Sequence, residues 1–147
     1  MGYLKQKVLA YIIREKHGKQ ELLVHGHRDY PEAGLQVPAG TAEAGEPLEQ
    51  ALFREIQEET GITDVQLLEK LEVYSYFNEY RNEVQERHVF LLRIIEKLPE
   101  RWDHIVEGDG EDEGLVFICS WLPIEGLQLS GEMGKSLKLI QAARFRG

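Results

Sequence analysis

The chain has 147 residues, a length that fits one globular unit with a sizeable core and is too short for two ordinary domains. Its 17 basic and 26 acidic residues give a formal charge of −9, which argues against a protein that holds long nucleic acid by neutralising phosphates. The same charge means that an anionic substrate needs metal ions to approach this surface. We expect a single domain over residues 1–147.

Cysteine usage and the N-terminus predict the compartment. Cys119 is the only cysteine, so no intramolecular disulfide can form and a reducing compartment is expected. Its apolar neighbours predict a small core residue rather than a catalytic thiol. The N-terminus has no long apolar segment, cleavage pattern or myristoylation signal. We therefore expect a soluble, cytoplasmic protein, a monomer or homodimer that does not associate with membranes.

Three β-strands are predicted before the first helix. They cover residues 7–14, 21–28 and 35–37, with a hairpin turn at 17–19 and a polar turn at 29–34. His25 and His27 would point to one face of the second strand, a spacing that could hold a metal. Because no third ligand is evident nearby, structural or substrate-edge histidines are the favoured interpretation.

Residues 47–60 predict a helix. Pro47 suits the first helical position because its missing N–H would be unpaired there, and Gly61 is the residue type that ends helices in a left-handed turn. At 100° per residue, the apolar side chains share one flank, which we expect to face the core. They are Leu48, Ala51, Leu52 and Ile56.

An acidic cluster lies at the edge of that flank. Glu55 and Glu59 fall on the same arc as the apolar residues, and Glu58 lies beside them. Like charges at this spacing repel, and desolvation raises the cost, so a divalent cation such as Mg²⁺, Mn²⁺ or Ca²⁺ would offset it. Arg54 and Glu46 could complete a charge network. A solvated glutamate-rich helix is the alternative, which the angular position of Glu55 and Glu59 disfavours.

After the helix, two strands are predicted to pair as a long hairpin. They cover residues 65–77 and 89–95, and a charged connection over 78–86 joins them. Tyr76, Phe77 and Tyr80 could line a pocket that stacks a nucleobase. Packing in the interior is the commoner role for aromatic residues in strands, and both interpretations stay open.

The C-terminal third begins with an acidic loop over residues 106–114, which is a solvated turn unless one of its acids reaches the metal cluster. A last strand over 115–122, a connection over 123–129 and a second helix over 131–145 follow. The expected core side of that helix is formed by Leu137, Leu139, Ile140 and Ala143.

Residues 40–62 resemble the complete Nudix box. Gly40 is followed after five residues by Glu46, and after seven more by the run REIQEETGI, which starts at Arg54. Ala39 is a mild departure, since the family usually has a second glycine there. The resemblance implies an α+β fold, the α/β/α sandwich with a mixed β-sheet between helices. It also implies a hydrolase that uses Mg²⁺ or Mn²⁺ to split pyrophosphate bonds in nucleoside diphosphate derivatives.

The resemblance also implies roles for individual residues. The expected cation ligands are Glu55, Glu58, Glu59 and the backbone carbonyl of Gly40. Arg54 would orient these carboxylates, and Glu46 would brace Arg54. The general base stays open between Glu55, Glu58 and an acid of the 111–113 loop. In that loop Glu111 or Glu113 would be the further ligand or base.

The substrate is the least determined part. Dinucleoside polyphosphates, nucleotide sugars, ADP-ribose and nucleoside triphosphates all fit the chemistry, and no subgroup signature matches beyond the weak support of Tyr80. The acidic balance argues against long RNA. The alternative to an enzyme is a catalytically inactive module of the same fold that senses nucleotides.

Overall fold

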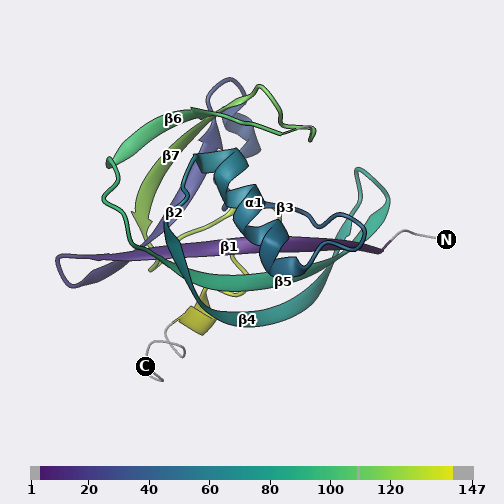
Figure 1. Ribbon diagram of the computed structural model, residues 1–147, viewed down its shortest axis with the longest axis horizontal. Coiled ribbons are helices and arrows are strands. Elements are labelled where there is room, and N and C mark those ends of the chain that lie inside the picture. Colours follow the sequence, from purple (N-terminus) through teal and green to yellow (C-terminus); the bar gives the residue numbers. More distant parts are fainter. Residues whose placement is uncertain (1–3, 109, 141–147) are drawn as a thin grey trace.

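A long N-terminal strand, β1 (Leu4–Lys16), is central to the sheet of the computed structural model, which describes residues 4–108 and 110–140 (Figure 1). The other elements are β2 (Lys19–His27), η1 (Pro31–Ala33), β3 (Ala39–Thr41), α1 (Leu48–Thr60), β4 (Val65–Asn78), β5 (Glu83–Ile94), β6 (Arg101–Ile105), β7 (Val116–Pro123) and η2 (Ser130–Glu132). Within those ranges seven strands form one mixed sheet in the order β4-β5-β1-β2-β7-β6, and β3 pairs with β1. β1 runs parallel to β5 and antiparallel to β2 and β3.

The sequence of β1 explains its central place. Successive side chains of a strand point to opposite faces, and β1 is apolar on both. One face carries Val8, Ala10 and Ile12, which belong to the core under α1. The other face carries Leu9 and Tyr11, which belong to a second core on the far side of the sheet. A strand buried on both faces must be covered by a layer on each side.

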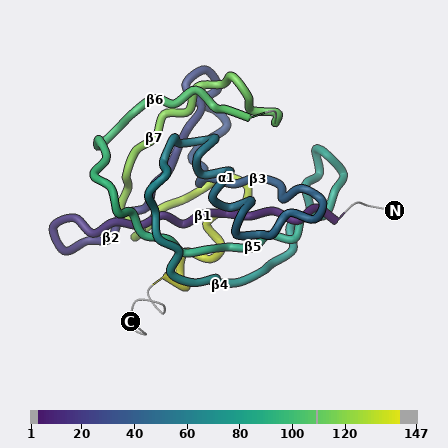
Figure 2. Tube along the Cα trace, in the orientation of Figure 1, coloured from purple at the N-terminus to yellow at the C-terminus, as the bar shows by residue number. Residues whose placement is uncertain are grey.

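Helix α1 provides one of these layers. It packs between the β1–β5 part of the sheet and the part formed by β2, β7 and β6, which diverges from β1 (Figure 2). The predicted core flank is confirmed, since Ala51, Leu52 and Ile56 are each at most 1% exposed. Gly61 ends the helix in the left-handed conformation as predicted, with φ 80°. Pro47 is the N-cap residue, so the helix starts one residue later than expected.

The other predicted strands are confirmed with shifted ends, but one predicted strand and one predicted connection are wrong. Residues 35–37 form no strand. Gln36 makes an isolated bridge to His25, and the strand β3 lies further on. Residues 83–86 are not part of a connection, because they form the start of β5. Two of their polar side chains, Glu83 and Gln85, line a cavity instead of an apolar core, so the apolar pattern of a buried strand is missing.

The prediction of a helix from residue 131 is also wrong. Gly131 and Glu132 both have φ of 60°, which a right-handed helix does not allow, and α-helical geometry begins at residue 138. Residues 141–145, including Ala143, lie outside the described part. Ile140 is 1% exposed and belongs to the second core, so this segment covers the far face of the sheet.

Side chains of the sheet fasten this segment. Tyr74 Oη donates a hydrogen bond to the carbonyl of Glu132 at 2.9 Å, and Arg87 Nη1 donates to that of Gly131. Tyr11 Oη also donates to the carbonyl of Met133. None of the helices in the described ranges combines the length and apolar character that crossing a membrane requires.

Candidate functional site

The acidic helix meets β3 through a close approach at Gly40. Gly40 pairs with Val8 in the β1–β3 ladder. A Cβ atom at Gly40 would lie 2.0 Å from Cδ of Glu55, so only glycine leaves room for that carboxylate. The absence of a side chain at position 40 therefore determines where the Glu55 carboxylate can lie.

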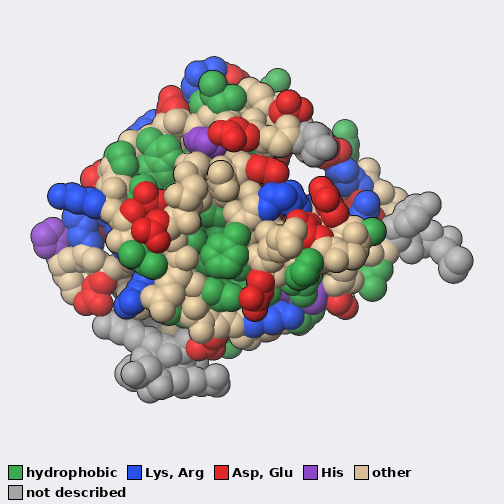
Figure 3. Space-filling model, in the orientation of Figure 1, with side chains coloured by type: hydrophobic (Ala, Val, Ile, Leu, Met, Phe, Trp, Pro, Cys, Tyr) green, Lys and Arg blue, Asp and Glu red, His purple; other side chains and the backbone are tan. Residues whose placement is uncertain are grey.

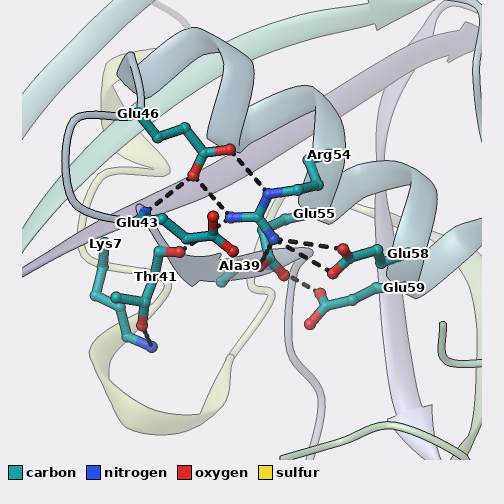
Figure 4. A network of polar contacts seen from close by, with 9 residues as sticks. All are labelled: Lys7, Ala39, Thr41, Glu43, Glu46, Arg54, Glu55, Glu58 and Glu59. Carbon is teal, nitrogen blue, oxygen red and sulfur yellow. Dashed lines mark hydrogen bonds and ion pairs between the residues drawn. The ribbon is translucent and has the colours of Figure 1, made fainter. Parts of the chain in front are cut away.

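Arg54 connects the helix to the loop that precedes it (Figure 4). Its Nε and Nη2 donate to the two carboxylate oxygens of Glu46, each at 2.9 Å. Nη1 donates to Glu55 at 2.9 Å and lies 3.4 Å from both oxygens of Glu58. Nη2 also donates to the carbonyl of Thr41 at 3.1 Å. This forked, charge-assisted geometry holds the pKa of Glu46 at about 2 and fixes the orientation of Arg54.

Glu59 is the most buried carboxylate of the cluster, at 7% exposure. Its Oε1 accepts a hydrogen bond from the backbone N–H of Ala39 at 2.9 Å and lies 3.6 Å from Nε2 of His25. Burial lowers the pKa of His25 to about 4, so the ring is neutral at pH 7 and forms no ion pair with Glu59. His25 stacks on Phe117 with ring centroids 4.2 Å apart.

Glu58 contacts the segment that follows β6. Its backbone carbonyl accepts a hydrogen bond from the N–H of Glu107 at 2.9 Å, and Nε2 of His104 lies 3.0 Å from the same oxygen. Gly108 has φ 96°, and a Cβ atom there would lie 2.7 Å from Cδ of Glu58. The loop after β6 is thereby held against the acidic cluster.

The electrostatics of the cluster follow from burial and mutual repulsion. Burial, followed by the charges of Glu59 and Glu58, raises the pKa of Glu55 to about 7, although Arg54 acts in the opposite direction. Burial also raises the pKa of Glu59 to about 8. Both carboxyls are thus partly protonated near neutral pH without a cation. A divalent cation beside them would favour their ionised forms.

These side chains lie at a cavity of about 620 Å³. Its described lining combines α1 and β3 with β1, β5, the β4–β5 turn and the loop after β6. In the space-filling view, acidic and basic side chains edge a hollow between α1 and that loop (Figure 3). Acidic residues outnumber basic residues nine to four in this described lining. A polyanionic substrate therefore needs added positive charge to bind here.

The loop acids reach the cavity. Glu111 and Glu113, the two candidates for a further ligand or base, both line it. The charge that acts on Glu59 from this loop is that of Asp112, which raises the pKa of Glu59. Asp112 lies between the two residues named from the sequence and is a third candidate.

The three aromatic residues do not join this site. None of them is in the described lining of the cavity. Tyr76 stacks under the guanidinium of Arg87, with the cation 3.7 Å from the ring centroid. Phe77 is 51% exposed and Tyr80 is 95% exposed. A nucleobase pocket made of these three residues is not formed in this conformation.

The donor set suits a hard divalent cation. Across the described residues, no three His, Cys, Asp or Glu side chains already have the geometry of a metal site. Nη1 of Arg54 lies against Glu55 and Glu58 and partly neutralises them. Desolvated carboxylates that repel one another, next to a glycine cradle, nevertheless match the oxygen ligands that Mg²⁺ and Mn²⁺ prefer.

Three residues near the acidic cluster were not predicted from the sequence in the roles they have: His25 and Asp112 as neighbours of Glu59, and Lys7 as part of the cavity lining. His25 and Asp112 reach Glu59 from elements distant in sequence, so no local pattern could reveal them. Lys7 lines the cavity from β1. A signal for Lys7 existed, because Lys5 and Lys7 interrupt the apolar alternation that Leu9 continues.

Comparisons with known proteins agree on the family. The family model described as NUDIX domain matches residues 4–142. An 8-oxo-dGTP diphosphatase of Escherichia coli strain K12 is 34% identical over 93 residues, which are 63% of this chain and 60% of that protein. An RNA pyrophosphohydrolase of Caulobacter vibrioides is 48% identical over 46 residues, or 31% of this chain and 27% of that protein. The chain thus spans less than two thirds of either relative.

A solved structure shows the fold. The crystal structure of a C. elegans Ap4A hydrolase binary complex superposes with a TM-score of 0.73 at 21% identity, covering 97% of this chain and 99% of that chain. At this identity the likeness establishes a shared α+β architecture.

Proposed function

The chain belongs to the NUDIX domain family, and on that basis we propose that it is a cation-dependent hydrolase. It cleaves a pyrophosphate bond in a nucleoside diphosphate linked to another group. The observation that carries this proposal is the desolvated set of carboxylates on α1, which line one cavity beside Arg54. Such a cluster is costly for stability alone and suits a site that holds cations against a diphosphate.

The cation would be Mg²⁺ or Mn²⁺, held by Glu55, Glu58 and Glu59 with the backbone carbonyl of Gly40. When bound, it supplies charge neutralisation for the diphosphate and acidifies a water molecule. Arg54 keeps the carboxylates oriented through its contacts with Glu55 and Glu58. Glu46 in turn fixes the guanidinium plane from the opposite side of the arginine.

The chain offers several bases for the attacking water. Glu55, with a pKa raised to about 7, is suited to accept a proton near neutral pH. Glu58 shares the cavity wall, and Glu111, Asp112 and Glu113 line the cavity from the loop. Phosphoryl and nucleotidyl transfer depend mainly on positioning and neutralisation, which these groups and Arg54 provide.

The substrate classes proposed are dinucleoside polyphosphates, nucleotide sugars, ADP-ribose and nucleoside triphosphates. The names of the two relatives, an 8-oxo-dGTP diphosphatase and an RNA pyrophosphohydrolase, support a nucleotide pyrophosphate. The net charge of −9 and the acidic cavity favour a small nucleotide over long RNA. A reducing cytoplasm would supply such nucleotides together with Mg²⁺.

The test is turnover of a substrate panel with Mg²⁺ or Mn²⁺, including a 5′-triphosphorylated oligonucleotide, with products identified after reaction in ¹⁸O-water. Glu58→Gln should lower kcat at least about a hundredfold, the range expected for losing a key electrostatic or acid–base group. Glu49→Gln is the matched control, because Glu49 is an exposed residue of the same helix. If Glu58→Gln turns over as fast as the control, the role of Glu58 is wrong.

A module that senses nucleotides without cleaving them is the rival proposal. It predicts nucleotide binding in calorimetry with no cation-dependent turnover of any panel member. The filled glutamate positions and the intact contacts of Arg54 favour the enzyme.

A further inference from the structure

The sheet face that packs in the second core continues beyond that core as a polar surface. This polar surface forms the floor of the cavity. On β1, Leu9 lies in the second core, whereas Lys5 and Lys7, on the same face of the strand, line the cavity. The change from apolar to charged residues occurs at the same level on β5, because Lys7 is paired with Arg87 and Leu9 with Val89. Strand geometry therefore directs two ammonium groups into the cavity.

The other basic groups of the cavity are already engaged. Arg54 is bound by the carboxylates described above, and Arg81 forms an ion pair with Glu111. Within residues 4–108 and 110–140, neither Lys5 nor Lys7 has a carboxylate within ion-pair distance. These two lysines are the positive charges of the described lining that remain available to a bound anion.

Lys7 is held in position for such a role. Its Nζ donates a hydrogen bond to Oγ1 of Thr41 at 2.9 Å, and an ammonium group has two further N–H donors. Burial lowers the pKa of Lys7, while the charges of Glu83 and Glu55 raise it. A half-buried ammonium without an ion-pair partner carries a desolvation cost, which a bound phosphate would offset.

We propose that Lys7, with Lys5 beside it, forms a subsite for the phosphate groups that lie beyond the scissile pyrophosphate. This inference rests on the proposed function and names its substrate class. With the scissile diphosphate at the glutamates, a nucleotide sugar or ADP-ribose has no further phosphate for the lysines. A nucleoside triphosphate or a dinucleoside polyphosphate does, so the site selects these polyphosphates.

The spacing of the lysines fits this assignment. Residues two apart on a strand are separated by about 6.8 Å, so the two ammonium groups can contact different phosphates of one chain. Glu83 lies near Lys7 and partly balances its charge, whereas Glu107 lies against Glu58 and disfavours a second anion on that side of the cavity. The lysine side of the floor is thus the place where additional negative charge is best accommodated.

The experiment compares Lys7→Gln with wild type on ATP, diadenosine tetraphosphate and ADP-ribose. The ratio of kcat/KM for the polyphosphates over ADP-ribose should fall at least about tenfold, the effect of losing a charged hydrogen bond. Lys7→Arg, which keeps the charge, should retain most of the preference. Lys19→Gln removes an exposed lysine at the start of β2, opposite the far end of β1, and should leave the ratio unchanged.

Two binding measurements separate this role from structural damage. Lys7→Gln should weaken binding of inorganic triphosphate in calorimetry with Mg²⁺ at least about tenfold. The affinity for Mn²⁺ alone, followed by electron paramagnetic resonance, should be unchanged or higher, because a positive charge beside the glutamates is removed. An unaltered substrate ratio, or loss of Mn²⁺ binding together with triphosphate binding, overturns the subsite. If wild type cleaves no substrate, the proposed function fails, and the triphosphate titration still decides the subsite.

Discussion

Gly40 shows how one residue without a side chain determines the position of a charged neighbour. The carboxylate of Glu55 occupies the space that a Cβ atom at position 40 would take, with Cδ only 2.0 Å from that point. Gly40→Ala must therefore displace Glu55 or open the β1–β3 pairing. We expect the affinity for Mn²⁺ to fall at least about tenfold and kcat at least about a hundredfold, as for a mispositioned catalytic group.

The control for this prediction is Gly26→Ala, because a Cβ atom at Gly26 meets only a Leu35 methyl carbon, at 3.9 Å. Mn²⁺ binding by electron paramagnetic resonance and the far-ultraviolet circular dichroism spectrum measure the site and the fold separately. Wild-type Mn²⁺ affinity in Gly40→Ala would show that the space at position 40 does not determine where the Glu55 carboxylate lies.

The raised pKa values of Glu55 and Glu59 predict how stability depends on pH. Their folded pKa values, about 7 and about 8, lie above the ordinary 4.5, so the folded state binds more protons than the unfolded state between those values. The free energy of unfolding must then fall as pH rises through this window. Histidines contribute little above pH 7, since their unfolded pKa is about 6.5.

We therefore expect the Tm of the protein in EDTA to drop by at least about 3 °C between pH 7 and 8.5. Glu59→Gln, whose amide resembles the protonated carboxyl, should remove much of this drop, and Mn²⁺ should raise Tm more at pH 8.5 than at pH 7. Differential scanning calorimetry at a series of pH values is the measurement. A wild-type Tm that rises with pH over this range would show that the carboxyls are not desolvated.

At the scale of elements, the C-terminal end of α1 joins the helix to β6. Trp102 Nε1 donates to the carbonyl of Thr60 at 2.9 Å, and a ring nitrogen of His104 contacts the carbonyl of Glu58. Gly61, with φ 80°, lies close to the same ring. A Cβ atom at position 61 would be 3.1 Å from the nearest ring atoms of His104. The helix end, the glutamates and β6 therefore depend on one another.

Gly61→Ala should lower the free energy of unfolding by about 2 kcal/mol, combining the left-handed backbone with the contact to His104. Gly18→Ala isolates the backbone effect, because Gly18 has φ 77° and open space around its Cβ position. That variant should lose only about 1 kcal/mol. Urea unfolding of the two variants gives both values, and an equal loss would show that His104 is not pressed by the added methyl group.

The elements differ in how far the sequence predicts them. The period and end residues of α1 are local signals, and the helix lies within one residue of its predicted start. β6 has no such signal: its five residues at the sheet edge do not alternate cleanly, since Asp103 and His104 are both polar. Its pairing with β7 and the contacts of Trp102 and His104 with α1 identify it. The failure at Gly131 has a similar origin, since hydrogen bonds from the distant Tyr74 and Arg87 fix that backbone.

The candidate site divides in the same way. Glu55, Glu58 and Glu59 are predictable because one helix carries them at fixed angles. The aromatic residues Tyr76, Phe77 and Tyr80 were grouped by sequence proximity, but strand alternation and the β4–β5 turn separate their side chains. Long-range partners of the glutamates depend on how β2 and the loop after β6 pack, which no local pattern encodes.

On the scale of the whole molecule, negative charge dominates. The formal charge is −9, and the described lining of the cavity repeats this excess. Such a field attracts divalent cations from a distance and repels anionic substrates until cations are bound. Under the proposed function, this field favours an order in which the cation binds first and the anionic nucleotide second.

This long-range attraction is sensitive to ionic strength, because the Debye length shortens from about 30 Å at 10 mM salt to about 10 Å at 100 mM. The cavity is open to solvent, so part of the attraction between its carboxylates and a cation is screened. We expect the dissociation constant of Mn²⁺ to rise at least about threefold between these salt concentrations. Titrations followed by electron paramagnetic resonance in NaCl provide the measurement.

The matched variant Glu49→Gln, which removes one exposed charge from α1 outside the cavity, should follow the same salt dependence with a small offset. A dissociation constant independent of salt would mean that contact with the ligating oxygens alone, without the surrounding acidic field, determines cation binding.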